Sequence, residues 1–159
     1  MQPTKRVFDR LKAFEGLRLR RYQDSAGVDT IGYGHTKYAP QLDEITPEQA
    51  AGLLVHDVSE FTTLVNNYMK VRKYRLNQNQ FDALVLFTYN TGGIKNGSAL
   101  DSAIRAKDAP AAAREMLKYT YAKGQQLPGL VKRRQYEARL FVTPYLDLKN
   151  ILVAVPFLL

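Results

Sequence analysis

The chain has 159 residues, no cysteine, two histidines and a formal net charge of +8. This length predicts a single domain with a sizeable core, and the lack of cysteine excludes a disulfide framework. Two histidines without cysteine give no credible metal site, so we expect neither a metal nor another cofactor. The basic residues are spread along the chain without a nucleic-acid-binding motif, so we expect no nucleic-acid partner.

The first predicted element is an amphipathic helix that begins near Lys5 and ends at Gly16. Its apolar residues recur at helical spacing with charged residues between them; they are Val7, Phe8, Leu11 and Phe14. Glycine is typical of a helix C-terminus, so Glu15 is expected in the last helical turn.

A β-hairpin is predicted after this helix. Residues 17–20 alternate between apolar and charged, as a strand with one solvent-exposed face does. Residues 24–27 have the composition of a turn, and residues 30–35 alternate again, with glycines that allow close backbone approach. The hairpin is therefore expected to return Asp24 and Thr30 to the end of the first helix.

Two carboxyl groups and a hydroxyl group thus fall within one short stretch. Asp24 follows Glu15 by nine residues, and Thr30 follows Asp24 by six. Hydrolysis of a glycosidic bond needs two carboxyl groups on opposite sides of that bond, so this pattern favours such chemistry. Asp29 is a rival carboxylate, but its alternation with Thr30 predicts that it points away.

Around these residues the sequence resembles the phage-type (T4-like) lysozymes, the endolysins of glycoside hydrolase family 24, in the branch found in lambdoid phages. The family motif is E-G-x-x-L-x-x-Y-x-D-x-x-G-x-x-T-x-G-x-G-H. Ten positions match it: Glu15, Gly16, Leu19, Tyr22, Asp24, Gly27, Thr30, Gly32, Gly34 and His35. The likeness extends from about residue 5 to about residue 142 and includes an R-R-x-x-E pattern at residues 133–137.

The resemblance implies a role for each of the three clustered residues. Glu15 would be the general acid that protonates the leaving oxygen, Asp24 would position or deprotonate water, and Thr30 would help to hold that water. The implied substrate is the β-1,4 bond between N-acetylmuramic acid and N-acetylglucosamine in bacterial peptidoglycan. The family is generally inverting, which requires carboxyl groups roughly 6.5–9.5 Å apart.

The implied fold is α+β, mostly α-helical and lysozyme-like. A small N-terminal lobe would carry a short antiparallel sheet, and a long helix would connect it to a helical C-terminal lobe. The substrate cleft would lie between the lobes, where ligand sites are common.

The helices of this fold have recognisable starts. Thr46 followed by proline is typical of a capped start for the long helix, and Asn77 begins a second capping pattern. The long helix carries one apolar stripe, namely Leu54, Val58, Phe61, Val65 and Met69. The helix over residues 81–89 is apolar on most faces and is expected in the core. Later helices are predicted to open at Ser98, Asp108 and Gly129.

Several residues near the predicted cleft have two interpretations. We interpret His35 as structural and paired with Asp57, because a carboxylate-paired histidine after a strand is a common structural device. The resemblance implies substrate contacts at Gly34, Tyr89 and Ser98. However, Tyr89 fits a core tyrosine equally well, and Ser98 is fully explained as a helix cap.

Two arginines in the last predicted helix also have two interpretations. Arg133 and Arg134 either approach Glu15 from that helix or form a solvated basic face, and the sequence does not separate these alternatives.

We expect one lysozyme domain over residues 1–145, followed by an apolar tail over residues 146–159. The tail is shorter than the about 20 residues that span a bilayer, so we expect no stable membrane insertion. No signal peptide is recognised, which predicts synthesis in the host cytoplasm and action on the cell wall after release. The expected partner is bacterial peptidoglycan, an anionic polymer that suits the positive net charge, and the protein is expected to be a monomer.

Two other classes of function are alternatives. The chain could be a catalytically inactive lysozyme-fold module that binds glycan or a partner protein, although the presence of Glu15, Asp24 and Thr30 argues for an enzyme. It could also kill by cationic membrane disruption, using the basic surface and the apolar tail.

Overall fold

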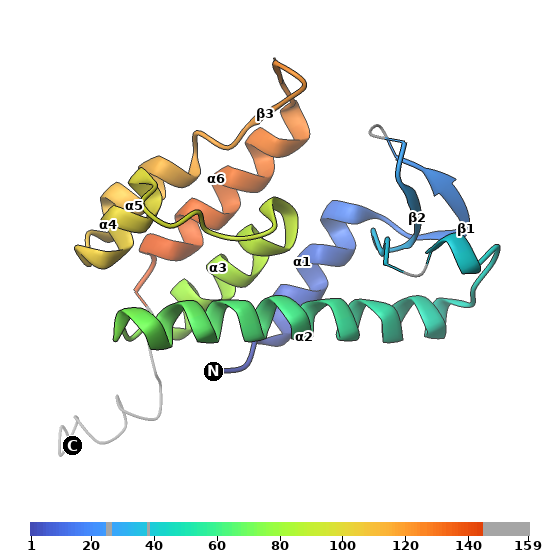
Figure 1. The fold of residues 1–159 in the computed structure, drawn as a ribbon, viewed down its shortest axis with the longest axis horizontal. Coiled ribbons are helices and arrows are strands. Elements are labelled where there is room, and N and C mark those ends of the chain that lie inside the picture. The colour runs from blue at the N-terminus through green and yellow to red at the C-terminus, as the bar shows by residue number, and fades with distance from the viewer. Residues whose placement is uncertain (25–26, 38, 145–159) are drawn as a thin grey trace, which may run out of the picture.

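The computed structural model describes residues 1–24, 27–37 and 39–144. Within them, six α-helices and one 3-10 helix accompany two small antiparallel sheets (Figure 1). In chain order the elements are α1 (Lys5–Glu15), β1 (Arg18–Gln23), β2 (Asp29–Gly32), η1 (Ala39–Gln41), α2 (Pro47–Arg72), α3 (Gln78–Thr91), α4 (Ala99–Arg105), α5 (Ala109–Met116), β3 (Tyr121–Ala122), β4 (Gln125–Gln126) and α6 (Pro128–Val142). The expected mainly helical α+β fold is confirmed.

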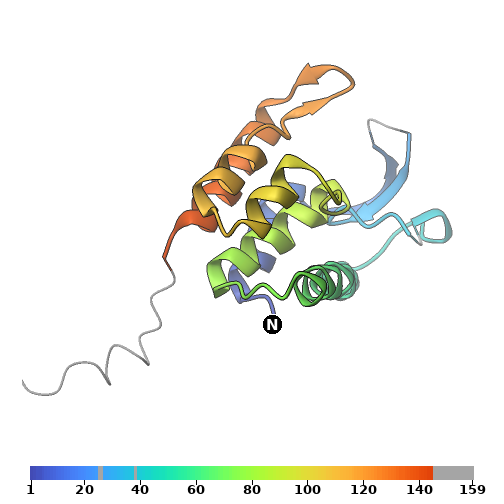
Figure 2. The ribbon, with the colours of Figure 1, turned by 60° about the vertical axis from the view of Figure 1, so that its left-hand side comes forward.

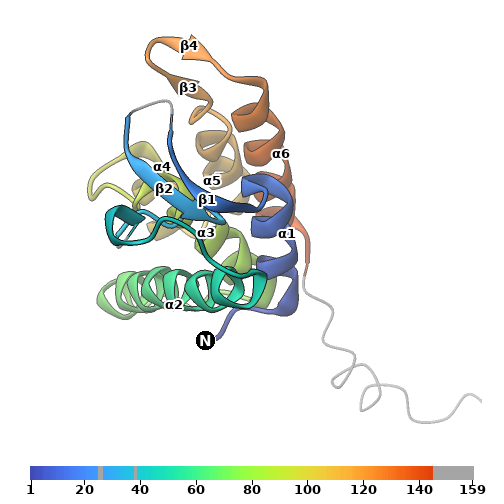
Figure 3. The same ribbon diagram turned by 90° about the vertical axis from the view of Figure 1, so that its right-hand side faces the viewer.

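The long helix α2 connects two lobes. The β1–β2 hairpin lies beyond the end of α1 toward one end of α2, and helices α3 to α6 gather toward the other (Figures 1 and 3). The β1–β2 and β3–β4 hairpins project on the same side of the molecule, one from each lobe (Figure 2). The C-terminal end of α1 therefore reaches the region between the lobes.

Most helix starts agree with the sequence. The capping boxes expected at Thr46 and Asn77 are both present, so their first turns satisfy their own N–H groups. Ser98 and Asp108 cap the next two helices through their side-chain oxygens. Helix α6 begins one residue before the expected Gly129.

The main core is built around α3. Residues 81–88 are all buried, as its apolar faces predicted. Helix α3 packs on α6, α2 and α1, so the C-terminal lobe and the first helix share one core. Of the apolar stripe on α2, only Phe61 is half-buried, and its ring lies 5.2 Å from the ring of Tyr89.

A second, smaller core holds the β1–β2 hairpin against the start of α2. Its buried residues are Ile31, Ala39, Ile45 and Ala50. Gly32 permits this close packing, because a Cβ there would lie 3.5 Å from the Cβ of Ala50. The hairpin, and with it the proposed site residues Asp24 and Thr30, is thereby fixed relative to α2.

The strands differ from the sequence-based expectation in three places. The first strand runs over Arg18–Gln23 instead of residues 17–20. The second strand ends at Gly32 instead of reaching residue 35, because Gly32 has a φ of 67° that turns the chain. Ile31 and His35 then pair through mutual backbone hydrogen bonds of 2.9 Å. The β3–β4 hairpin was not predicted, since each of its strands has only two residues and is exposed.

The apolar tail over residues 146–159 lies outside the described residues. Over residues 1–24, 27–37 and 39–144, no helix combines the length and the apolar character needed to cross a membrane.

Asp101 forms a buried polar network that ties α4 to the end of α2. Its carboxylate accepts hydrogen bonds from Tyr68 at 2.6 Å, from Arg72 at 2.7 Å and from the Gly97 amide at 2.9 Å. Burial alone would raise the pKa of Asp101, but these hydrogen bonds and the charge of Arg72 outweigh it and lower that pKa to about 2.

This network predicts a pH-dependent stability. A carboxyl group whose pKa falls from 3.8 to about 2 on folding contributes about 2 kcal/mol of stability, present above pH 3.8 and lost as the pH falls through 2. Replacing Asp101 by Asn should lower the free energy of unfolding most near neutral pH, and the difference should shrink below about pH 4. Urea titrations of both proteins across this range measure it. The exposed Asp9→Asn variant, which loses only a surface ion pair, is the control. A difference that does not change with pH would contradict this assignment.

Candidate active site

Glu15 is the last residue of α1, and the chain leaves the helix immediately after it. Gly16 ends the helix with a φ of 69°, and its N–H donates to the Lys12 carbonyl at 3.1 Å. This backbone conformation strongly favours glycine. The Glu15 side chain is 23% exposed, so it is partly sheltered while still reaching solvent.

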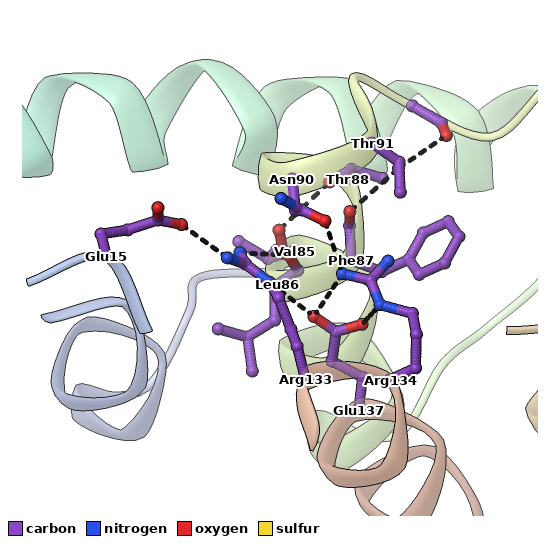
Figure 4. Close-up of polar contacts among 11 residues, drawn as sticks. Glu15, Val85, Leu86, Phe87, Thr88, Asn90, Thr91, Arg133, Arg134 and Glu137 are labelled. Carbon is purple, nitrogen blue, oxygen red and sulfur yellow. Dashed lines mark hydrogen bonds and ion pairs between the residues drawn. The ribbon is translucent and has the colours of Figure 1, made fainter. Parts of the chain in front are cut away.

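Arg133 from α6 contacts the carboxyl group of Glu15. Its Nη1 donates to Glu15 Oε1 at 2.5 Å (Figure 4). The guanidinium group of Arg133 also lies 5.0 Å from the centre of the Phe14 ring. The Arg133 side chain is only 5% exposed, so this ion pair joins the end of α1 to α6 at the edge of the core.

Gly34 lies against the second oxygen of the same carboxyl group. A Cβ at Gly34 would stand 3.4 Å from Glu15 Oε2, and the φ of Gly34 is 86°. The backbone conformation therefore favours glycine, and a Cβ there would lie in van der Waals contact with the carboxyl group. Oε1 of Glu15 thus contacts the guanidinium group of Arg133, and Oε2 faces the backbone of Gly34, which carries no side chain.

Asp24 lies at the start of the β1–β2 turn and is half-buried. Its backbone N–H donates to the Val28 carbonyl at 3.0 Å, and its Oδ1 accepts the Val28 N–H at 2.9 Å. The Gly27 N–H donates to the Asp24 carbonyl at 3.0 Å. These bonds are those of an Asp that stabilises its own turn, and they hold the carboxyl group in one orientation.

Thr30 pairs with Tyr22 across the hairpin and is 3% exposed. Its hydroxyl donates to the Val28 carbonyl at 2.9 Å, which leaves the oxygen able to accept a further hydrogen bond. Asp29, the rival carboxylate, forms an ion pair with Arg21 at 3.4 Å.

His35 and Asp57 are in direct contact. Nδ1 of His35 lies 2.9 Å from each carboxylate oxygen of Asp57. His35 is 2% exposed, so this pair connects the loop after β2 to α2 inside the protein. The partner of His35 is the one that the sequence predicted.

Tyr89 lines a pocket of about 270 Å³ together with Gly34, His35, Asp57 and Phe61. Its hydroxyl donates to the Tyr33 carbonyl at 3.0 Å. Burial raises the pKa of Tyr89, and the nearby charges of Asp57 and Glu15 raise it further. Tyr89 is therefore packed in the core at one edge and exposed to this pocket at another.

Ser98 has a structural role in the described fold. Its hydroxyl accepts the Asp101 N–H at 3.1 Å as the cap of α4. The capping role alone explains why a serine is at this position, so a substrate contact of Ser98 stays a prediction.

The two alternatives for the arginines of α6 are now distinguished: Arg133 contacts Glu15, whereas the partners of Arg134 are Asn90 and Glu137. Arg133 and Arg134 are 4% and 0% exposed, so the interpretation as a solvated basic face was wrong. Glu137, which the sequence analysis placed in the R-R-x-x-E pattern without assigning it a role, lies between them and is 0% exposed. The available signal was its spacing, since positions three and four residues apart share one helix face.

The two-lobed helical fold, with a carboxyl group at the end of α1 held by a buried arginine of α6, is that of a lysozyme-type protein. Residues 12–137 match the family model described as phage lysozyme, and the chain belongs to this family.

Named relatives agree with this assignment. The chain is 42% identical over 136 residues to an endolysin of Acyrthosiphon pisum secondary endosymbiont phage 1, covering 82% of this chain and 91% of the relative. It is 34% identical over 149 residues to the endolysin of Salmonella phage P22, covering 90% and 99%. An endolysin of Bacillus phage B103 is 41% identical over 139 residues, 84% of this chain but only 51% of that longer protein.

Solved structures share the fold. The muramidase domain of SpmX from Asticaccaulis excentricus superimposes with a TM-score of 0.78 at 36% identity, covering 90% of this chain and 99% of that domain. The endolysin of Escherichia coli O157:H7 phage FAHEc1 gives a TM-score of 0.74 at 36% identity, covering 89% and 94%.

The contact between Gly34 and Glu15 predicts a sensitive position. Replacing Gly34 by Ala would strain the backbone that lies in contact with the carboxyl group of Glu15, so lytic activity should fall by about tenfold or more. The matched control is Gly124→Ala, because Gly124 also has a positive φ of 77° but no atom within 4 Å of the new Cβ. Initial rates of peptidoglycan clearing, with folding checked by circular dichroism, measure the difference. Equal activities of the two variants would contradict the proposed proximity effect.

Proposed function

We propose that this protein is an endolysin that hydrolyses the β-1,4 bond between N-acetylmuramic acid and N-acetylglucosamine in bacterial peptidoglycan. The observation that supports this most is the environment of Glu15. A carboxyl group at a helix end lies against Arg133 and Gly34, next to a hairpin whose turn carries Asp24. Two carboxyl groups on separate elements are what this reaction requires.

Glu15 is proposed as the general acid. It gives its proton to the glycosidic oxygen as the bond from that oxygen to the anomeric carbon breaks. In the resting structure Glu15 Oε1 accepts from Arg133. Oε2, which faces the backbone of Gly34, is the oxygen better placed to carry the proton.

Asp24 is proposed to accept a proton from the attacking water, and Thr30 to help hold that water. Water oxygen then forms the new bond to the anomeric carbon on the face opposite the leaving group. The bonds from Asp24 to its own turn support this role, because a base must be held in a fixed orientation. Gly34 and Tyr89 are proposed to contact the sugar, and the His35–Asp57 pair to support the loop that carries Gly34.

The surface charge suits this substrate. A net charge of +8 favours association with an anionic wall polymer. This attraction weakens as salt is added, because salt screens it. The protein is proposed to act as a monomer. Relatives from bacteriophages PS119 and PS34 are named SAR-endolysins, and we propose that this chain likewise acts on the cell wall after leaving the cytoplasm.

The assignment of Glu15 predicts the effect of a conservative substitution. Glu15→Gln keeps the shape but cannot donate a proton, so the lytic rate should fall by about 10²–10⁴-fold. The measurement is clearing of purified peptidoglycan, with circular dichroism to show that the variant is folded. Glu115→Gln serves as the control, because it removes a carboxylate of α5 that forms an ion pair with Lys118. A folded Glu15→Gln protein that clears peptidoglycan at the normal rate would refute the assignment of Glu15 as the general acid.

The stereochemistry gives an independent prediction. If water attacks from the face opposite the leaving group, the first product carries the α-anomer at its new reducing end. Proton NMR of a soluble peptidoglycan fragment, recorded before mutarotation, distinguishes the two anomers. Early release of the β-anomer would show retention and would exclude the proposed role of Asp24.

A further inference from the structure

Three charged side chains of α6 lie inside the protein behind the proposed general acid. Arg133, Arg134 and Glu137 are 4%, 0% and 0% exposed. Removing charges from water is costly, and an apolar cluster of similar volume is often at least as stable. A stabilising role alone is therefore a weak explanation for placing these three charges here.

The contacts of Glu137 are directed at both arginines (Figure 4). Its Oε1 accepts from Arg133 Nε and from Arg134 Nη2, each at 3.2 Å. Its Oε2 forms an ion pair with Arg134 Nε at 3.0 Å. Burial raises the pKa of Glu137 to about 7, although the charges of Arg134 and Arg133 oppose this shift.

Arg134 is held in turn by α3. Its Nη2 also donates to Asn90 Oδ1 at 2.9 Å, and its guanidinium group lies 4.8 Å from the centre of the Phe87 ring. Glu137 is therefore bound to a group that is itself immobilised on the central helix of the core.

The guanidinium group of Arg133 has three fixed contacts. Nε donates to Glu137, Nη2 donates to the Leu86 carbonyl at 3.3 Å, and Nη1 donates to Glu15. A guanidinium group is planar, so contacts at Nε and Nη2 determine where Nη1 points. The position of Glu15 consequently depends on Glu137, which accepts a hydrogen bond from Nε at another edge of the same planar group.

We propose that Glu137 is a positioning residue for the reaction, which acts by fixing the plane of Arg133 so that Arg133 holds Glu15 in place. This inference rests on the proposed role of Glu15 as general acid. Glu137 touches neither substrate nor water in this scheme, and its effect passes entirely through Arg133.

The test compares Glu137→Gln with the wild-type protein at about pH 8, above the raised pKa of Glu137, where its carboxylate is ionised. Initial rates are measured over a range of purified peptidoglycan concentrations. Misplacing the acid should lower kcat by about tenfold and change KM by less than about twofold. The matched control is Asp82→Asn, since Asp82 is 0% exposed and hydrogen-bonded to Thr4 at the opposite end of α1. It should lose stability while the folded protein keeps its kcat.

A double-mutant comparison separates positioning from a purely structural role. In an Arg133→Met background, Glu137→Gln should lower kcat by less than about twofold further, because the residue through which it acts is gone. An unchanged kcat in Glu137→Gln, or a full additional loss in the Arg133→Met background, would overturn the proposal.

If Glu137→Gln does not fold, Glu137→Asp takes its place, since it keeps the charge but withdraws the carboxylate by one methylene group. The folded Asp variant should still show a lower kcat, and a wild-type kcat would overturn the proposal. Failure of the proposed function gives a different result. An active Glu15→Gln protein would refute the acid itself, whereas an inactive Glu15→Gln with a normal Glu137→Gln would refute only the positioning role.

Discussion

The ion pair between Glu15 and Arg133 is the contact on which the proposed site depends. It joins residues that are 118 positions apart in sequence, one at the end of the first helix and the other in the last. The ion pair is partly buried, with exposed fractions of 23% and 5%. A pair in such a place needs further hydrogen bonds to offset its desolvation. Glu137 and the Leu86 carbonyl provide them for Arg133.

The rest of the fold places other groups around this pair. The main core fixes α1 and α6 against α3, which sets the distance across which Arg133 reaches Glu15. The smaller core anchors the β1–β2 hairpin on the start of α2, which sets the position of Asp24 independently. The two proposed carboxyl groups thus belong to separately supported elements. Their relative placement therefore depends on both cores.

Much of the fold could be predicted from the sequence, because the signals are local. The capping boxes at Thr46 and Asn77 and the apolar face of α3 depend on residues within one helix, and all three are present. The β3–β4 hairpin has a weaker signal. Its turn residues Lys123 and Gly124 both have positive φ, at 50° and 77°, but only the glycine is a recognisable turn signal in the sequence. The residues of both strands are exposed, so no apolar pattern predicts them.

The site could be predicted only in part. Glu15, Asp24, Thr30 and His35 fall within one short motif, so their proximity follows from local structure. The environment of Arg133 could not be predicted, because its burial depends on how α6 packs on α3. Glu137 was recognised only as part of the R-R-x-x-E pattern, and its role was not predicted for the same reason, since a glutamate close to basic residues on a helix is usually exposed to solvent.

The central claim is that this site cleaves the bond on the reducing side of N-acetylmuramic acid. The most direct test is to digest purified peptidoglycan, reduce the products with borohydride and identify the new reducing-end sugar by mass spectrometry. The account predicts reduced N-acetylmuramic acid at every new end. Reduced N-acetylglucosamine, or fragments without a reducible end, would contradict it.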